Sequence, residues 1–513
     1  MNADSLRVAV LVRRPEVPAW LADLVASLEA APTVDLAVHA VGARSPRPRK
    51  PVLLDLYERI DRRLFAADPD ALEPTVVAVQ PAPASFAGHD VVLDFASAEP
   101  DAAGVRFGVW VLTHELGERP PLERMTPRAR LGTRVYRLQI DALLGDGRRV
   151  VVHRSYGALD PASLHRTRSQ ALWKAKAAFV HRLETVRRLG EPYLESVPGS
   201  EAQAFSQLSN RAVARYATTS ALGVVSRRAR ALGEREAWFV AARPLGGCGP
   251  DFGSVNGFVP LELPRDAVAD PFLLEEGGAT YLYFEDDDWG AGRGHISYAR
   301  VDADGRVASE PETALARPYH LSYPFVFRHR GEVFLIPESS ANGTVELYRA
   351  DPFPTNWTLE QVLLRDVHAL DATLHDDGDR LWLFACLTAP GASPNDDLHL
   401  WSSTALTGPW EPHPLNPVVS DARSARPAGR IFRQGADLVR PSQDCSQRYG
   451  FAIVFNRIDV LTDDNYRETA VGRIDPGWHP GVLATHTYNF GGGVEVIDGI
   501  RRVAAGPLRR RRG

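Results

Sequence analysis

The chain has 513 residues, of which 44% are hydrophobic and 24% are charged, and its formal net charge at pH 7 is −5. This composition is ordinary for a globular protein and excludes a chain that is disordered throughout, because there is enough apolar surface to bury. The balance of 59 Lys and Arg residues against 64 Asp and Glu residues gives no global reason to expect a nucleic acid or an anionic membrane as partner. At roughly 150 residues per domain, the length predicts two to four domains.

The sequence shows no disulfide framework, structural zinc motif or membrane span. Its three cysteines are far apart and form no C-x-x-C pair (Cys248, Cys386 and Cys445). The apolar run near the N-terminus is about six residues long before Arg13 and Arg14 interrupt it, which is too short for a secretion signal or a transmembrane helix. We therefore expect a cytoplasmic protein without a membrane span.

Residues 1–190 have the alternating strand and helix pattern of an α/β domain. Apolar runs predict strands, and apolar residues at helical spacing predict helices; the strands are expected at residues 7–12, 34–41, 90–96 and 107–112, and the helices at residues 16–30 and 53–65. This alternation predicts a Rossmann-like open sheet with right-handed crossovers. The first strand is followed by Leu-Val-Arg-Arg-Pro-Glu instead of G-x-G-x-x-G, so a dinucleotide is disfavoured and no cofactor is predicted.

Four segments of distinct composition accompany this domain. Residues 163–190 have the apolar spacing of one or two amphipathic helices. Residues 191–234 are polar, small and basic, and are predicted to form a linker or a helix. A basic, Pro-rich loop is expected at residues 44–51. The basic tail at residues 506–513 is interpreted as a solvated terminus, with an RNA or lipid contact as the alternative.

Residues 235–505 consist of strand units that repeat about every 50 residues. In the first three units an apolar strand, a Gly turn and an aromatic-rich strand follow one another; the units begin at Asp270, Tyr323 and Asp371, at offsets of 53 and 101 residues from the first. Two further units are expected at residues 429–456 and 486–498, and residues 236–260 are expected to supply the strands that close the ring. Short strands at this period predict an all-β five-bladed β-propeller, because a β-sandwich would not explain the fixed offsets.

Several runs of residues in this half are specific when they are taken together: Tyr323-Pro324-Phe325-Val326-Phe327, Ile336-Pro337-Glu338-Ser339-Ser340, Thr344-Val345-Glu346-Leu347-Tyr348, Asp371-Ala372-Thr373-Leu374 and Arg440-Pro441-Ser442-Gln443-Asp444. With them, residues 235–505 resemble the N-terminal region of plant glucosamine inositolphosphorylceramide transferases and their bacterial relatives. The half also resembles the five-bladed propellers of arabinanases, β-xylosidases and invertases, which share an Asp-Pro at the start of an inner strand, here Asp270-Pro271. The resemblance implies a carbohydrate-active protein.

The first 190 residues resemble a formyltransferase-type domain through the opening strand, Gly108-Val109-Trp110 and the Trp173-Lys174 helix. Folate-dependent formyltransferases carry an Asn-x-His pair after the corresponding strand, and their amide and imidazole stabilise the tetrahedral intermediate. His114 matches the histidine, but Leu112 stands where the asparagine belongs. We therefore interpret this domain as a degenerate relative, with His114 as the remnant of its site or as a structural histidine.

The resemblance to glycosidase propellers also implies catalytic carboxylates. It assigns Asp270 as base or nucleophile and Asp371 as the carboxylate that positions the sugar and tunes the acid. The general acid of those hydrolases is a Glu in the fourth blade, where this sequence has none. Glu338, which ends a strand of the second unit, is the best substitute, since glycoside hydrolysis needs a second carboxyl group with a raised pKa. Each carboxylate also has an ordinary alternative role in turns or ion pairs.

Arginines near the fourth unit suggest an anionic ligand, because a guanidinium binds a carboxylate or a phosphate with two hydrogen bonds. The candidate substrate-binding residues are Arg426, Arg430, Arg440, Tyr323 and Asp444. The alternative is that these arginines pair with acidic residues between blades. His320 and His486 lie near strand ends, but no ligand spacing accompanies them, so no metal is predicted.

Three functions remain open from the sequence, and fold alone does not choose among them. The first is a glycosidase-like or glycosyl-transferring enzyme that acts on an intracellular or surface-polysaccharide sugar in the propeller. The second is a non-catalytic protein that binds a glycan or a sugar nucleotide in polysaccharide assembly. The third is an amino-sugar formyltransferase, which Leu112 argues against. The oligomeric state cannot be predicted.

Overall fold

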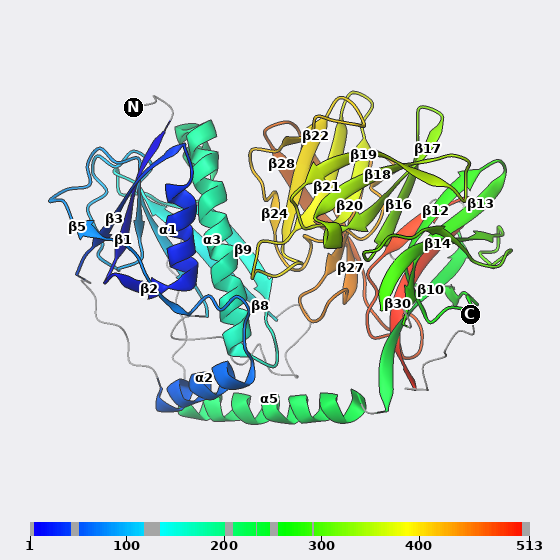
Figure 1. Ribbon diagram of the computed structural model, residues 1–513, viewed down its shortest axis with the longest axis horizontal. Helices are drawn as coiled ribbons and strands as arrows, with labels where there is room; N and C mark the ends of the chain where they lie inside the picture. The colour runs from blue at the N-terminus through cyan, green and yellow to red at the C-terminus, as the bar shows by residue number, and fades with distance from the viewer. Residues whose placement is uncertain are drawn as a thin grey trace. The chain divides into compact units, whose positions relative to one another are not determined.

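The computed structural model describes residues 5–42, 51–116, 134–200, 209–231, 233–246, 255–289 and 292–504 (Figure 1). Cys248, residues 44–50 of the predicted basic loop and the tail at residues 506–513 lie outside these ranges. The chain divides into two compact units, residues 1–224 with 389–393 and residues 225–388 with 394–513. None of the described helices is long and apolar enough to cross a membrane.

The first unit contains a seven-stranded sheet in the order β5-β3-β1-β6-β7-β8-β9. The strands are β1 (Leu6–Val12), β3 (Val34–Ala40), β5 (Gln80–Pro81), β6 (Val91–Asp94), β7 (Val109–His114), β8 (Val135–Leu143) and β9 (Arg149–Ala158). The first five run parallel, and β8 and β9 add an antiparallel edge next to β7. The predicted α/β sheet is therefore confirmed, whereas the two antiparallel strands were missed.

The helices of this unit agree with the predicted segments. They are α1 (Ala19–Glu29), α2 (Val52–Leu64), α3 (Leu164–Leu189), α4 (Glu191–Ser196) and α5 (Asn210–Ala231). Two short strands, β2 (Glu16–Pro18) and β4 (Pro74–Val76), pair with each other outside the main sheet. The 26-residue α3 is one continuous helix. It begins after Ser163, whose hydroxyl accepts the backbone N–H of Arg166 at 3.1 Å, and ends at Gly190, whose φ of 66° favours glycine.

The second unit is a propeller whose described strands form five sheets, so the predicted five-bladed fold is confirmed (Figure 1). Blade 1 contains β12 (Ala267–Glu276), β13 (Ala279–Asp288), β14 (Arg293–Val301) and β15 (Glu312–Leu315); blade 2 contains β16 (Ser322–His329), β17 (Glu332–Ser339), β18 (Thr344–Ala350) and β19 (Trp357–Arg365). Blade 3 contains β20 (Ala369–Asp376), β21 (Leu381–Leu387), β22 (Asp397–Ser403), β23 (Glu411–Pro412) and β24 (Val419–Ser420). The short 3-10 helix η1 (Ser340–Asn342) follows β17.

The last two blades close the ring. Blade 4 contains β25 (Phe432–Gln434), β26 (Asp437–Asp444), β27 (Ala452–Leu461) and β28 (Tyr466–Ile474). Blade 5 combines β29 (Tyr488–Gly491) and β30 (Val494–Ala504) with β10 (Glu234–Pro244) and β11 (Val259–Pro260). Since β10 pairs with β30 along its whole length, the first and last strands of the propeller share one sheet, as predicted for residues 236–260.

The fixed offsets in the sequence correspond to a repeated bulge. Asp270, Tyr323 and Asp371 occupy the same place in the innermost strands of blades 1, 2 and 3, and their φ angles are 53°, 43° and 54°. At each place the pairing with the next strand is interrupted by a register shift. A left-handed residue at a bulge re-aims its side chain and costs strain when it is not glycine, which makes the position a marker of function.

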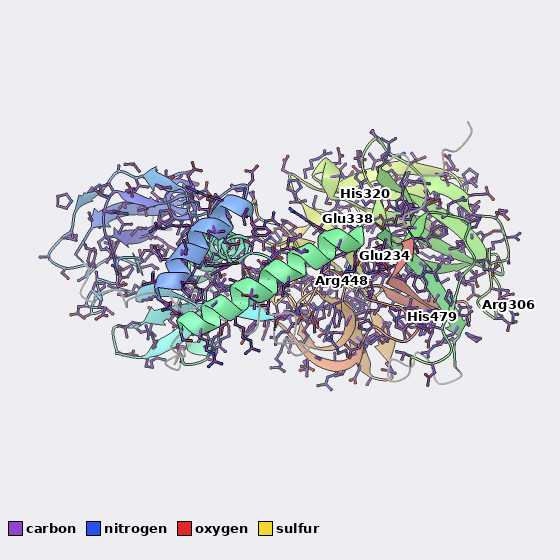
Figure 2. The ribbon with its side chains drawn as sticks, turned by 90° about the horizontal axis from the view of Figure 1, so that it is seen from below. Glu234, Arg306, His320, Glu338, Arg448 and His479 are labelled. Atoms are coloured by element: carbon purple, nitrogen blue, oxygen red, sulfur yellow. The ribbon has the colours of Figure 1, made fainter. Side chains whose placement is uncertain are left out.

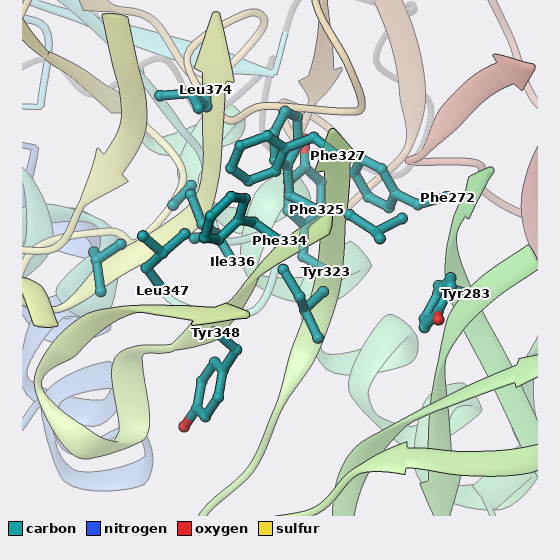
Figure 3. Close-up of a cluster of buried hydrophobic side chains, with 14 of the residues drawn as sticks. Phe272, Tyr283, Tyr323, Phe325, Phe327, Phe334, Ile336, Leu347, Tyr348 and Leu374 are labelled. Atoms are coloured by element: carbon teal, nitrogen blue, oxygen red, sulfur yellow. The ribbon is translucent and has the colours of Figure 1, made fainter. Parts of the chain in front are cut away.

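A large apolar cluster holds the first three blades together (Figure 3). Phe272 packs edge-on against Tyr323 with ring centroids 4.8 Å apart, and both side chains are fully buried. The Tyr323 hydroxyl also bonds Thr373 Oγ1 at 2.9 Å and accepts the backbone N–H of Gly429 at 2.7 Å. Tyr323 thereby ties blade 2 to blade 3 and to the segment before β25.

Tyr323→Phe tests this connection. The change keeps the ring but leaves the buried N–H of Gly429 without its acceptor, so we expect a loss of about 1–3 kcal/mol in the free energy of unfolding, measured by urea titration. Tyr281→Phe is the matched control, because the Tyr281 ring packs against Phe353 in the same cluster, and it should change stability little. Equal effects of the two variants would contradict the assigned role.

Candidate functional site

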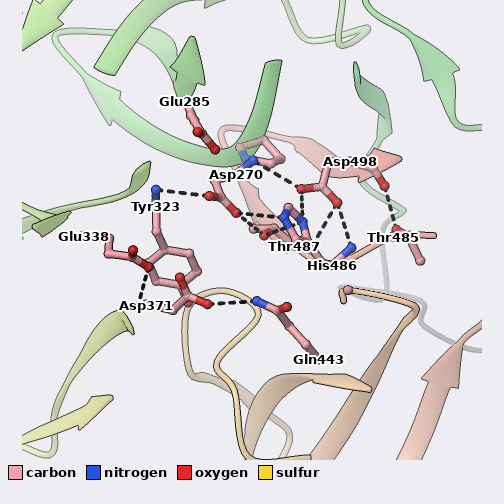
Figure 4. A network of polar contacts seen from close by, with 12 residues as sticks. Asp270, Glu285, Tyr323, Glu338, Asp371, Gln443, Thr485, His486, Thr487 and Asp498 are labelled. Atoms are coloured by element: carbon pink, nitrogen blue, oxygen red, sulfur yellow. Dashed lines mark hydrogen bonds and ion pairs between the residues drawn. The ribbon is translucent and has the colours of Figure 1, made fainter. Parts of the chain in front are cut away.

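Polar side chains from all five blades converge on one buried cluster (Figure 4). Blades 1 to 5 contribute Asp270, Glu338, Asp371, Gln443 and Asp498, in that order. All five residues are buried, and the most exposed of them, Glu338, is 8% exposed. The three carboxylates predicted from the sequence as catalytic thus lie together, although up to 101 residues separate them along the chain.

Arg426, in the segment between β24 and β25, supplies the positive charge of the cluster. Its guanidinium donates to both carboxylate oxygens of Asp371, at 2.6 and 3.4 Å, and lies 3.5 Å from Glu338 Oε2. The amide of Gln443 donates to Asp371 Oδ2 at 2.8 Å. The predicted ligand-binding arginine is therefore in the cluster, where it fixes the orientation of Asp371.

The surroundings of Glu338 favour the protonated form of its carboxyl group. Burial raises the pKa of its carboxyl to about 8, the negative charge of Asp371 adds to the rise, and Arg426 opposes it. Glu338 Oε1 accepts the Ser340 hydroxyl at 2.8 Å, and Oε2 accepts the backbone N–H of Asp371 at 3.3 Å. A carboxyl group with this pKa has the protonation state that a general acid needs.

Asp270 stands at the blade 1 bulge. Its carboxylate accepts the Thr487 hydroxyl at 2.6 Å and the backbone N–H of Tyr323 at 3.1 Å, and His486 Nε2 lies 3.8 Å away. Burial raises the pKa of Asp270 to about 7, while His486 opposes the rise. Asp270 is therefore poised to change charge near neutral pH.

His486 and Asp498 form an ion pair that the sequence analysis did not identify as part of a site. His486 Nδ1 lies 2.5 Å from Asp498 Oδ2, and Asp498 also accepts the backbone N–H groups of His486 and Thr487. Burial lowers the pKa of His486, but Asp498 and Asp270 outweigh it and raise the value to about 9. The imidazole is therefore a cation that faces two carboxylates.

Two aromatic rings cover this end of the cluster. Trp238 stacks on His486 with ring centroids 4.0 Å apart, and Tyr449 packs edge-on against the same imidazole at 5.3 Å. The guanidinium of Arg426 lies 4.8 Å from the Tyr449 ring. Because Tyr449 is 41% exposed, it connects the buried cluster with the protein surface.

Asp270, His486 and Asp498 are also a possible metal site, since their ligand atoms all lie within 4.8 Å of one another. An imidazole must lose its proton to bind a metal ion, and contact with Asp498 raises the pKa of His486, so a proton competes with a metal ion for this ring at neutral pH. No metal is assigned.

Blade 1 carries a counterpart of Glu338. Glu285 on β13 pairs with Ala269, the residue before the bulge of blade 1, just as Glu338 pairs with Ser322 in blade 2. In blade 3 the corresponding residue is Cys386. His320 Nε2 lies 3.2 Å from Glu285 Oε1, and its Nδ1 accepts the backbone N–H of Gly294 at 2.8 Å. The hydrogen bond to Glu285 raises the pKa of His320, which is labelled in Figure 2.

Arg440 and Asp444 lie outside the cluster. Arg440 pairs with both oxygens of Glu468 at 2.7 and 2.8 Å, and Asp444 pairs with Arg473 at 2.8 Å. Their partners are on β28 of the same blade, so the predicted ligand roles of both residues find no support in these contacts. Arg440 and Asp444 point away from the cluster because alternate residues of a strand point to opposite faces, and Gln443 lies on the other face of β26.

Arg430 and Tyr323 have other partners. Arg430 donates to the backbone carbonyl of Val326 at 2.6 Å and lies over the ring of Phe325, and burial lowers its pKa to about 10. It pairs with no carboxylate among the described residues. Tyr323 reaches the cluster through its backbone N–H, which donates to Asp270, while its phenol ring belongs to the apolar core.

His114 is the last residue of β7 in the other unit. Burial, with a contribution from Arg168, lowers the pKa of its imidazole to about 4, so the ring is neutral, and its Nδ1 has no hydrogen-bond partner among the described residues. Leu112 offers no amide beside it. The formyltransferase interpretation of this unit remains a prediction.

The fold and the cluster together define a five-bladed propeller with a buried carboxylate–arginine site. Residues 227–475 match the family described as glucosamine inositolphosphorylceramide transferase 1, N-terminal. This range contains the acidic residues of blades 1 to 3 together with Arg426 and Gln443, and it ends before His486. The comparisons do not support the formyltransferase-like interpretation of residues 1–190.

Two curated plant relatives carry the name glucosamine inositolphosphorylceramide transferase 1. The protein of Oryza sativa subsp. japonica is 37% identical over 245 residues, which are 47% of this chain and 32% of the relative. The protein of Arabidopsis thaliana is 37% identical over 211 residues, which are 41% of this chain and 28% of the relative. The chain thus spans about a third of the length of these relatives.

Solved structures give a more distant likeness. A thermostable family-43 glycoside hydrolase matches 48% of this chain and 78% of its own, with 12% identity and a TM-score of 0.28. A family 117 glycoside hydrolase of Zobellia galactanivorans matches 52% of this chain and 91% of its own, with 15% identity and a TM-score of 0.32. The assignment of the fold rests on the five sheets and not on these scores.

The protonation of Glu338 predicts a particular pH dependence of stability. Since the native state keeps a proton that an ordinary glutamate, with a pKa of 4.5, has lost, stability falls as the pH rises toward about 8. Glu338→Gln removes this dependence. Between about pH 5 and about pH 8, the variant should therefore gain about 1–3 kcal/mol in the free energy of unfolding relative to the wild type, measured by urea titration.

Glu346→Gln is the control for this prediction. Glu346 is equally buried in blade 2, but hydrogen bonds from Tyr348, Tyr319 and other groups outweigh its burial and lower its pKa. Its amide variant should lose stability and should show no relative gain as the pH rises. The same pH trend in both variants would contradict a protonated Glu338.

Proposed function

We propose that the propeller is the catalytic domain of a carbohydrate-active enzyme that transfers or hydrolyses a glycosyl unit. The observation that carries the proposal is the protonated Glu338 carboxyl beside the Arg426-bound carboxylate of Asp371, with Asp270 in the same buried cluster. Cleavage of a glycosidic bond needs one carboxyl group that donates a proton and a second that acts as base or nucleophile.

Each group has a defined role in this proposal. Glu338 donates its proton to the departing oxygen of the glycosyl donor. Asp270, when ionised, acts as the base that activates the acceptor or as the nucleophile at the sugar carbon. Asp371 and Arg426 hold the donor, and Asp371 keeps Glu338 protonated until the bond breaks, because the negative charge of Asp371 raises the pKa of Glu338.

The names of the plant relatives support transfer to or from a phosphorylated acceptor. Those proteins are named for a glucosamine and for an inositolphosphorylceramide, which contains a phosphate group. In this chain Arg430 is a half-buried cation without a carboxylate partner among the described residues, and it is the residue available to bind an anionic group. The substrate class proposed is therefore an amino sugar or another sugar on an anionic carrier.

A non-catalytic role in sugar binding is the second candidate. It is favoured by the partners of the carboxylates, since Asp371 is held by Arg426 and Gln443, and Asp270 by Thr487 and Tyr323. A cluster whose hydrogen bonds are all satisfied internally also serves to keep five blades together. Both candidate functions predict ligand binding, but only the first predicts turnover.

A transfer and hydrolysis screen with aryl glycosides and nucleotide sugars tests the proposal. Glu338→Gln should lower turnover by about 10²–10⁴-fold while ligand binding, measured by calorimetry, persists. The loss should be smallest for aryl donors whose leaving group needs no proton, and the fall in rate above about pH 8 should be absent from the variant. Asp270→Asn should abolish turnover for every donor.

Glu346→Gln serves as the control for these rates, because Glu346 is buried in blade 2 but is held by Tyr319, Tyr348 and Thr344 instead of by Arg426. It should retain turnover. Ligand binding by the wild type without turnover on any donor would favour the second candidate. Turnover that survives both Glu338→Gln and Asp270→Asn would place the site elsewhere.

A further inference from the structure

Helix α2 exposes most of its aliphatic side chains and buries Leu54 and Asp61. Five aliphatic side chains of α2 are 39% to 78% exposed. One of them, Leu53, lies next to a ridge that the other four form at four-residue spacing: Val52, Leu56, Ile60 and Leu64. In contrast, Leu54 and Asp61, which lie on one side of the helix seven residues apart, are 0% and 1% exposed. A helix that packed all its apolar side chains on a protein core would bury the ridge as well.

Contacts within the same unit hold α2 in this orientation. Asp61 Oδ2 accepts the backbone N–H of His165 at 2.7 Å, in the first turn of α3. Tyr57 packs edge-on against Tyr216 of α5 at 5.4 Å, beside α2 in Figure 1. Rotation of the helix to bury its aliphatic ridge would break these contacts, so the exposure of the ridge belongs to the fold.

The charges around α2 are arranged unevenly. Its acidic residues are buried or paired, since Glu58 lies 2.6 Å from Arg168 and Asp55 lies 2.7 Å from Arg59. Arg63, next to Leu64 on the exposed side, has no acidic partner among the described residues. The sequence directly before α2 adds four more cations, Arg44, Arg47, Arg49 and Lys50. Among the described residues, Arg63 thus places a positive charge beside the aliphatic ridge.

We propose that α2 lies on a membrane surface that contains anionic lipids, with its aliphatic ridge in the interface. Interfacial helices combine one apolar face with flanking Arg or Lys residues in this way. With 13 residues α2 is about 20 Å long, which is too short to span a bilayer.

This inference is independent of the proposed chemistry, because α2 belongs to the α/β unit and shares no residue with the propeller cluster. The overall charge of −5 does not argue against it, since attraction to a charged surface depends on the charges within about a Debye length of that surface. The placement also suits an enzyme whose acceptor is a lipid, although it does not require one.

Vesicle flotation with the full chain tests the proposal, with phosphatidylcholine vesicles with and without phosphatidylglycerol as the probe. The wild type should float with the anionic vesicles at low salt and less so at high salt. Leu56→Ser with Ile60→Ser should weaken this binding by at least about tenfold, and Arg63→Glu should weaken binding to anionic vesicles only. All these side chains are exposed, so thermal unfolding should change little.

Leu359→Ser with Val471→Ser is the matched control, because these residues are exposed to a similar extent on β19 and β28 of the propeller. This control should float like the wild type. The proposal is overturned if the wild type binds neither kind of vesicle, or if the α2 variant binds as well as the wild type. A wild-type dimer that the α2 variant converts to a monomer, without vesicle binding, would overturn it in favour of a second copy of the chain.

Discussion

The site depends on one buried cation, the guanidinium of Arg426. Ionised carboxylates that are removed from water are costly unless a positive charge or a proton compensates each of them. Arg426 compensates Asp371 directly, His486 does the same for Asp498, and Glu338 keeps its proton because the remaining positive charge does not suffice. The acid–base character of the cluster therefore follows from a shortage of cations within it.

The backbone positions these groups through a feature that repeats from blade to blade. Each of the first three blades places a residue with positive φ at a bulge of its innermost strand, and the side chain or backbone N–H at that position bonds the next blade. Asp270 accepts from Tyr323 of blade 2, and Glu338 of blade 2 accepts from Asp371 of blade 3. The hydrogen bonds that join neighbouring blades are thus the same ones that orient the carboxylates, so stability and site geometry are coupled.

Much of this architecture is visible in the sequence, because the strand units repeat at fixed offsets and the bulge residues Asp270 and Asp371 begin those units. The arginines were harder to place. Arg440 and Asp444 lie on the face of β26 opposite to Gln443, and a prediction based on residue type alone does not distinguish the two faces of a strand. His486 and Asp498 were missed as partners because their pairing depends on the register of the β29–β30 hairpin, in which Tyr488 lies opposite Ile497. The exposed face of α2 was missed because apolar spacing predicts a helix but does not say which side is buried.

The most direct test of this account is the protonation state of Glu338. Infrared difference spectra of the wild type against Glu338→Gln at neutral pH report whether the deleted group was a carboxylic acid or a carboxylate. The account predicts that the variant loses the carbonyl stretch of a protonated carboxyl group, and that this loss disappears when the spectra are recorded well above pH 8. The loss of carboxylate bands alone at neutral pH would contradict it, because an ionised Glu338 has no proton to donate and the cluster would then be an ordinary network of ion pairs.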